Sequence, residues 1–171
     1  GMARYLDNYE SCDTADMLHA LESGTRSAYQ SMTTPTEGTM LTVMRDAASA
    51  AGELSNPPIH EVLNKVVEEA QASVDRTPSL LPQLAEAGVV DAGGLGLSII
   101  LEGMRFAHLE EEFPDPSPIP ANNVDMSGVQ HEGHGYCTEF VVTGQSLDRN
   151  RLENVLKDTG AESILVVGDS E

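Results

Sequence analysis

Apolar residues recur at helical spacing through the first two thirds of the chain, with breaks at proline and glycine. The clearest run covers 59–74, where valine, leucine, isoleucine and alanine follow each other at intervals of three and four residues. Shorter runs of the same kind predict helices over 14–32 and over about 36–51. Asp13 or Thr14 is expected to cap the first of these, because a side-chain oxygen can accept the unpaired N–H groups of a first turn.

Helix boundaries in the second part of this region are expected at prolines and glycines. Asn56 is predicted to cap the helix of the clearest run, with Pro57–Pro58 in its first turn, where proline is favoured. The Thr-Pro pair predicts the start of a further short helix over 77–84, ended by Gly88. A long helix is then predicted over 91–112.

The pattern changes after this long helix. Four prolines alternate with other residues over 113–120, which is typical of an extended linker. Residues 136–142 and 163–167 have the β-branched content of strands, and 147–159 has the spacing of a helix between them. The sequence therefore predicts an α+β fold: an antiparallel helical bundle, followed by a small βαβ segment whose strands would be parallel.

One glycine-rich stretch, 89–104, joins two β-branched residues to an apolar helix. Asp91 can cap this helix, and Gly93 and Gly94 allow close approach of another group because they lack Cβ. Two interpretations remain open here. The stretch is either a tight turn into a helix packed through small residues, or a helix start that binds phosphate. Its glycine spacing matches neither the Rossmann nor the P-loop motif.

The charge balance narrows the possible partners. The chain has 9 basic and 28 acidic residues, a formal net charge of −19, which disfavours nucleic acid and anionic membranes. The apolar stretches are too short to predict membrane insertion. Cys12 and Cys137 do not form a disulfide framework, so a reduced, cytoplasmic setting is expected.

Three segments together resemble a known family. They are 35–43, then 77–84 with 88–94, and finally 135–140. In this order and at these separations they are similar to the kinase subunit of bacterial fatty acid kinase, within the dihydroxyacetone kinase superfamily. The resemblance implies that 3–112 is the C-terminal half of an antiparallel eight-helix nucleotide-binding domain. It also implies a linker over 113–133 and the start of an α/β middle domain over 134–171.

The resemblance implies ATP with magnesium in the complete protein. Thr39 and Met40 match the family's pair at a helix start beside the nucleotide, and Asp91, Ala92 and Gly93 match a segment that closes the site from the other side. The family's magnesium-binding aspartate cluster has no counterpart in this sequence. No catalytic residue is therefore assigned, and the chain alone is expected to be inactive.

A zinc site is a further expectation. Cys137 matches a family cysteine that helps to bind zinc, and His131 and His134 precede it at a spacing that suits zinc. The alternative is that Cys137 is a small buried hydrophobic residue of a strand.

Three functions stay open on the sequence. The resemblance favours ATP-dependent phosphorylation of a fatty acid carboxylate that a partner binding subunit presents. One alternative is a dihydroxyacetone kinase-type activity on a small hydroxy ketone. The other is a non-catalytic oligomerisation or interaction module. Half a helical barrel would leave apolar helix faces uncovered, which predicts a homo-oligomer, and a twofold dimer first.

Overall fold

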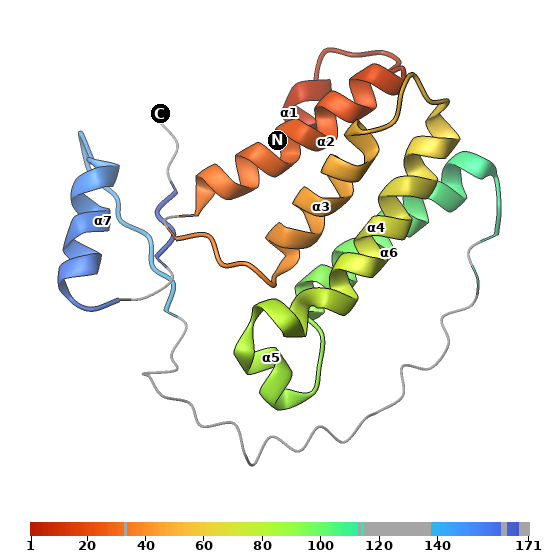
Figure 1. The fold of residues 1–171 in the computed structure, drawn as a ribbon. Helices are drawn as coiled ribbons and strands as arrows, with labels where there is room; N and C mark the ends of the chain where they lie inside the picture. Colours follow the sequence, from red (N-terminus) through yellow and green to blue (C-terminus); the bar gives the residue numbers. More distant parts are fainter. Residues whose placement is uncertain (33, 113, 115–137, 162–163, 168–171) are drawn as a thin grey trace.

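The computed structural model describes residues 1–32, 34–112, 114, 138–161 and 164–167. Most of these residues lie in helices, which Figure 1 shows in chain order. The helices are α1 (Met2–Leu6), α2 (Thr14–Ser31), α3 (Met40–Gly52), α4 (Ile59–Leu80), α5 (Pro82–Ala87), α6 (Ala92–Leu109) and α7 (Arg149–Asp158).

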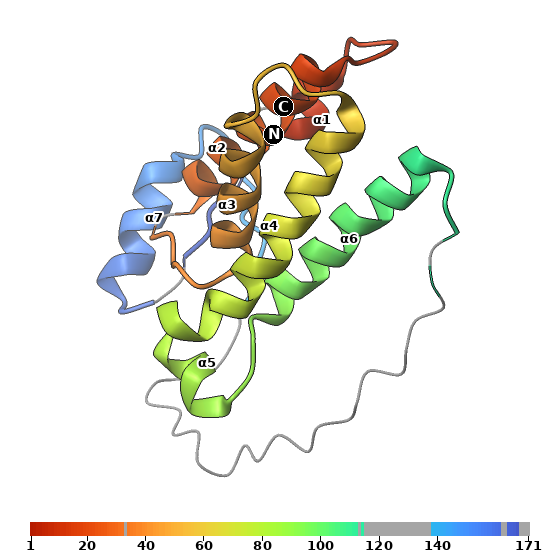
Figure 2. The same cartoon turned by 45° about the vertical axis from the view of Figure 1, so that its right-hand side comes forward.

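Helix α4 lies at the centre of the bundle that α1 to α6 form. It packs along α3 and α6, carries α5 at its C-terminal end, and also contacts α2. α2 packs on α3, α1 packs on α2, and α3 also contacts α6 (Figures 1 and 2). The buried core comes from α2, α3, α4 and α6, and consists of Leu21, Val43, Ala47, Ala51, Val62, Val66, Ala70, Val74 and Leu101.

Side chains cap the starts of α2, α3, α6 and α7, the last through Asp148. The cap predicted at Asp13 is confirmed: its carboxylate accepts from the backbone N–H of Asp16, which returns the bond in a capping box. Thr39 caps α3 and Asp91 caps α6. The cap predicted at Asn56 is wrong. Asn56 has a left-handed backbone with φ of 50°, and α4 starts after Pro58 without a side-chain cap.

The helix start predicted at the Thr-Pro pair is also wrong, because α4 continues through Pro78 to Leu80. Proline has no N–H, so within a helix the carbonyl four residues earlier loses its usual donor. Here that carbonyl belongs to Val74, and the Thr77 hydroxyl donates to it at 2.7 Å. The expected end at Gly88 is confirmed, since Gly88 ends α5 with a left-handed φ of 65°.

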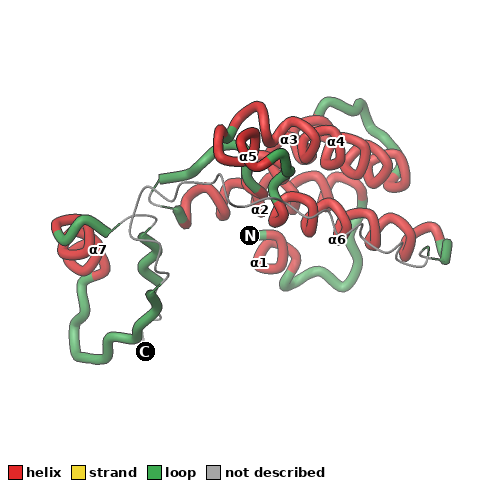
Figure 3. Tube along the Cα trace, turned by 90° about the horizontal axis from the view of Figure 1, so that it is seen from below, coloured by secondary structure: helices red, strands yellow, loops and turns green. Residues whose placement is uncertain are grey.

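The predicted α+β class is wrong for the residues that the structure describes, among which no strand occurs (Figure 3). Residues 138–142 and 164–167 have strand-like composition but form no strand, and Val141 is 89% exposed. A strand needs a neighbour to bond its N–H and C=O groups, and two short segments supply too little buried surface to pair. The helix predicted between them is present as α7. The domain limits remain predictions.

Helix α6 is apolar on two sides. One side carries Gly94, Ser98 and Leu101, which are buried against the bundle. The other side carries Ile99 and Ile100, which are 46% and 63% exposed. Within the described ranges, neither α6 nor any other helix is long and apolar enough to cross a bilayer.

Candidate functional site

The starts of α3 and α6 meet at one end of the bundle. A methyl group added at Gly93 would lie 3.6 Å from Cβ and 3.7 Å from Sδ of Met40. Gly93 is exposed and Met40 is 48% exposed, so this junction opens on the surface. The structure thus brings together the two segments that the sequence placed on opposite sides of one site.

The neighbouring glycine, Gly94, has a different role. It is buried, and a methyl group added there would lie 2.8 Å from Cγ2 of Val43 and 3.7 Å from Cγ2 of Val74. A side chain at this position would clash with Val43 of α3 but make only ordinary contact with Val74 of α4. Gly94 therefore permits the helix contact, whereas Gly93 leaves space at the surface.

Asp91 holds the first turn of α6. Its Oδ2 accepts from the N–H of Gly94 at 2.6 Å, and its carbonyl accepts from the N–H of Leu95 at 2.9 Å. A carboxylate is favourable here because the N-terminus of a helix is electropositive. The first N–H groups of a helix have no acceptor within the helix, and Ala92 and Gly93, where α6 begins, are exposed.

Thr39 holds the first turn of α3 in a similar way. Its Oγ1 accepts from the N–H of Leu41 at 3.3 Å and donates to the carbonyl of Thr36 at 2.8 Å. The Thr39 hydroxyl is therefore engaged in shaping the turn. What this end of α3 presents outward is the half-exposed Met40 side chain.

A carboxylate that sequence reasoning missed, Glu37, fixes the segment before α3. Tyr29 donates to its Oε1 at 3.0 Å, while Thr42 and Arg45 each donate to its Oε2 at 2.7 Å. The Thr42 hydrogen bond lowers the pKa of Glu37, partial burial opposes the shift, and Tyr29 and Arg45 reinforce it. Its partners come from α2 and α3, so no local pattern around Glu37 announces them.

The same segment touches the end of α4. Gly38 is buried with a left-handed φ of 79°, and its N–H donates to the Thr42 hydroxyl at 2.8 Å. A methyl group at Gly38 would lie 2.8 Å from Cβ of Leu81 and 3.1 Å from Cβ of Leu80. The end of α4 thus lies directly against the entry to α3, where only glycine fits.

No metal site is present among the residues that the structure covers: no three side chains of histidine, cysteine, aspartate or glutamate lie together in a way that could hold an ion. The zinc ligands predicted from the sequence, His131, His134 and Cys137, lie outside the described residues. That expectation remains a prediction.

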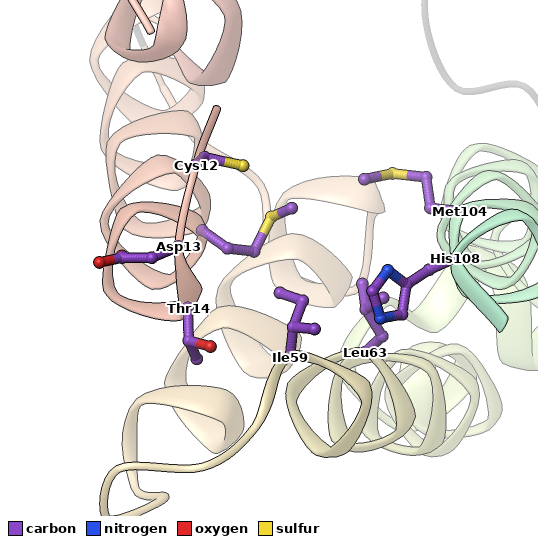
Figure 4. A pocket seen from close by; sticks show the side chains of 8 residues that line it. Cys12, Asp13, Thr14, Ile59, Leu63, Met104 and His108 are labelled. Carbon is purple, nitrogen blue, oxygen red and sulfur yellow. The ribbon is translucent and has the colours of Figure 1, made fainter. Parts of the chain in front are cut away.

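A cavity of about 330 Å³ lies at the other end of α4 (Figure 4). The starts of α2 and α4 and the last turns of α6 line it, mainly with apolar side chains. Cys12 is an exposed, unpaired thiol at its edge, and His108 reaches in from α6. This cavity is separate from the predicted nucleotide site. The predicted site residues, none of which lines the cavity, are Thr39, Met40, Asp91, Ala92 and Gly93.

Comparison with known proteins identifies relatives for the whole chain. The DAK2 domain family matches residues 1–106. An uncharacterised protein of Staphylococcus saprophyticus is 34% identical over all of this chain, and protein YloV of Bacillus subtilis is 33% identical over 99% of it. An uncharacterised protein of Staphylococcus epidermidis is 31% identical over the full chain. In each case the match covers 34% of the relative, so the chain spans about a third of their length.

Proposed function

We propose that this chain, which belongs to the DAK2 domain family, supplies one wall of a nucleotide phosphate site in a phosphotransferase of the dihydroxyacetone kinase family. The observation that carries the proposal is the junction of two capped helix starts, α3 and α6, around Met40 and Gly93. Helix N-termini bind phosphate because their N–H groups and dipoles favour negative charge. A junction of two helix N-termini suits a polyphosphate better than a single N-terminus does.

The chemistry of this wall is positioning. In phosphoryl transfer the protein holds phosphates and metal in place, while the acceptor attacks directly. The α6 start can bind phosphate oxygens through backbone N–H groups, and Gly93 lets them approach without a side chain in the way. The family's magnesium-binding aspartates have no counterpart in this sequence. We therefore propose that this chain alone binds MgATP weakly and does not hydrolyse it. The cellular setting that we propose is the cytoplasm.

The acceptor we propose is a fatty acid carboxylate presented by a partner subunit. Support comes from the three linked segments of the sequence, and from relatives that match the chain beyond residue 106 as well as within the DAK2 region. A helical domain followed by a further segment that the relatives also match suits the fatty acid branch. Phosphorylation of a small hydroxy ketone such as dihydroxyacetone is the alternative within the same family.

The site itself is tested by two matched glycine substitutions on α6. Gly93→Ala places a methyl at the junction, 3.3 Å from Oδ2 of Asp91 and in ordinary contact with Met40. It is expected to weaken MgATP binding about tenfold, or roughly 1.4 kcal/mol. Gly96→Ala places the same methyl one turn further on, with no atom within 4 Å, and should leave binding unchanged. Titration with MgATP, followed by the amide signals of Met40 and Ala92, measures both.

Three results decide the outcome of this titration. Shifts confined to the two helix starts, with affinity lost only in Gly93→Ala, support the proposal. Equal affinities of the two variants contradict it. Shifts that appear elsewhere on the bundle, or none at millimolar MgATP, contradict it as well.

A second candidate function is self-association through α6. Ile99 and Ile100 form an exposed apolar strip on a helix whose other side is already buried, and exposed apolar surfaces of this kind mark contact sites. A twofold dimer would cover the strip with its own copy. Light scattering at micromolar concentration should then give a dimer mass, and Ile100→Glu should reduce it to the monomer mass. A monomer in the unsubstituted protein would exclude this candidate.

A further inference from the structure

We infer that Thr77 is a positioning residue for the nucleotide wall: its hydroxyl sets where the α6 start lies. The inference rests on the proposed function. The Thr77 side chain is fully buried near the end of α4. Its Oγ1 accepts from the backbone N–H of Asp91 at 3.0 Å and donates to the carbonyl of Val74 at 2.7 Å.

The following proline makes a hydroxyl necessary at this position. In a regular helix the N–H of residue 78 would donate to the Val74 carbonyl, but Pro78 has none. The hydroxyl proton of Thr77 replaces that donor. Because the proton is committed to Val74, the oxygen is left to accept, and the N–H it accepts from belongs to Asp91. Only serine and threonine can combine these two bonds in so small a side chain.

The bond to Asp91 acts on the residue that organises the α6 start. The backbone of Asp91 is held by Thr77, and the carboxylate of Asp91 in turn holds the N–H of Gly94. Thr77 thus acts on the first turn of α6 indirectly, through its hydrogen bond to Asp91. It contacts no part of the surface where the phosphates are proposed to lie, since it is fully buried.

The end of α4 also fixes the opposite wall. The N–H of Leu81 donates to the carbonyl of Thr77 at 3.0 Å, and Cβ of Leu81 lies where a side chain at Gly38 would have to go. One turn of helix therefore supports the entry to α3 on one side and the start of α6 on the other. Thr77 sets the position of Asp91 relative to Met40 from this common support.

The test compares three substitutions on α4. Thr77→Val keeps the shape but removes both hydrogen bonds. Thr77→Ser keeps both bonds. Ser73→Ala is the matched control, because Ser73 is equally buried on the same helix but bonds to Asp46 on α3, at 2.8 Å. The readouts are hydrogen exchange of the Asp91 amide without nucleotide, and the affinity for MgATP.

Thr77→Val is expected to speed exchange of the Asp91 amide about tenfold relative to core amides, and to weaken MgATP binding about tenfold. Thr77→Ser should restore both to near the unsubstituted values. Ser73→Ala should lower the unfolding midpoint while leaving both readouts unchanged. If the valine variant does not fold, Thr77→Ala, which leaves room for a water, takes its place with the same expected direction.

Failure of the two proposals can be told apart. If the unsubstituted protein binds no MgATP, the proposed function fails. If it binds MgATP and Thr77→Val binds as tightly, or its Asp91 amide exchanges as slowly, the positioning role fails. If Ser73→Ala weakens binding as much as Thr77→Val, the effect of Thr77 is one of general stability, and the inference is overturned.

Discussion

Truncation of Leu101 to alanine is expected to lower the free energy of unfolding by about 2–5 kcal/mol. Leu101 is 3% exposed and joins α6 to the core that Val43 and Val66 help to form. Removing its methyl groups leaves a cavity that packed helices fill only in part, which adds to the loss of apolar burial. Urea denaturation followed by circular dichroism measures the change.

The adjacent residue provides the control. Ile100→Ala removes a similar amount of side chain from a position that is 63% exposed, and should change the free energy of unfolding by less than about 0.5 kcal/mol. Both variants are measured at dilute concentration, so that self-association does not contribute. If Leu101→Ala and Ile100→Ala lower the free energy of unfolding by similar amounts, α6 does not pack on the bundle through the side that carries Leu101.

Gly94→Val is expected to destabilise the bundle by about 1–3 kcal/mol through overpacking, and also to abolish MgATP binding. Its Cβ alone would lie 2.8 Å from Cγ2 of Val43, and two further methyl groups would follow. Relief requires α6 to move away from α3, which separates Gly93 from Met40. Thermal unfolding and the MgATP titration together measure the two effects.

Gly96→Val controls for placing a β-branched residue in the helix. Its Cβ would meet no atom within 4 Å, and valine has a slightly better helix propensity than glycine, so only a small gain of a few tenths of a kcal/mol is expected. If the Gly94→Val variant is as stable as the Gly96→Val variant and binds MgATP equally well, the close approach of α6 to α3 is contradicted.

Amphipathic spacing predicted most of the helical bundle. The run over 59–74 lies inside α4 because its apolar residues form one continuous face, which any neighbouring helix would bury. The end of α4 was mispredicted because Pro78 usually marks a boundary. Whether a helix continues through a proline depends on which group donates to the carbonyl that the proline leaves without a donor. Here the carbonyl belongs to Val74 and the donor is the hydroxyl of Thr77.

Composition misled at 138–142 and 164–167 for a different reason. β-branched residues favour the extended backbone locally, but a strand is completed by hydrogen bonds to another segment. Pairing depends on partners far away in the sequence, which residue patterns do not reveal. The helix between these segments needs no such partner for its backbone, and α7 was predicted correctly.

The contacts that hold the two helix starts in place were predicted only in part. Asp91 was recognised as a cap from its place before a glycine-rich helix, and the structure confirms that bond. The nucleotide role of the junction remains a prediction. Glu37 and Thr77 were missed, because their partners Tyr29 and Asp91 lie 8 and 14 residues away and meet them only in the folded bundle.

The shared support of the two helix starts would couple binding of the proposed nucleotide to folding. A nucleotide that touches both starts can bind only while α3, α4 and α6 are packed, because the end of α4 holds the other two in place. By thermodynamic linkage, nucleotide at one hundred times its dissociation constant would stabilise that unit by about 2.7 kcal/mol. Saturating nucleotide would thus act as a folding ligand for α4, a helix that lies behind both walls of the proposed site.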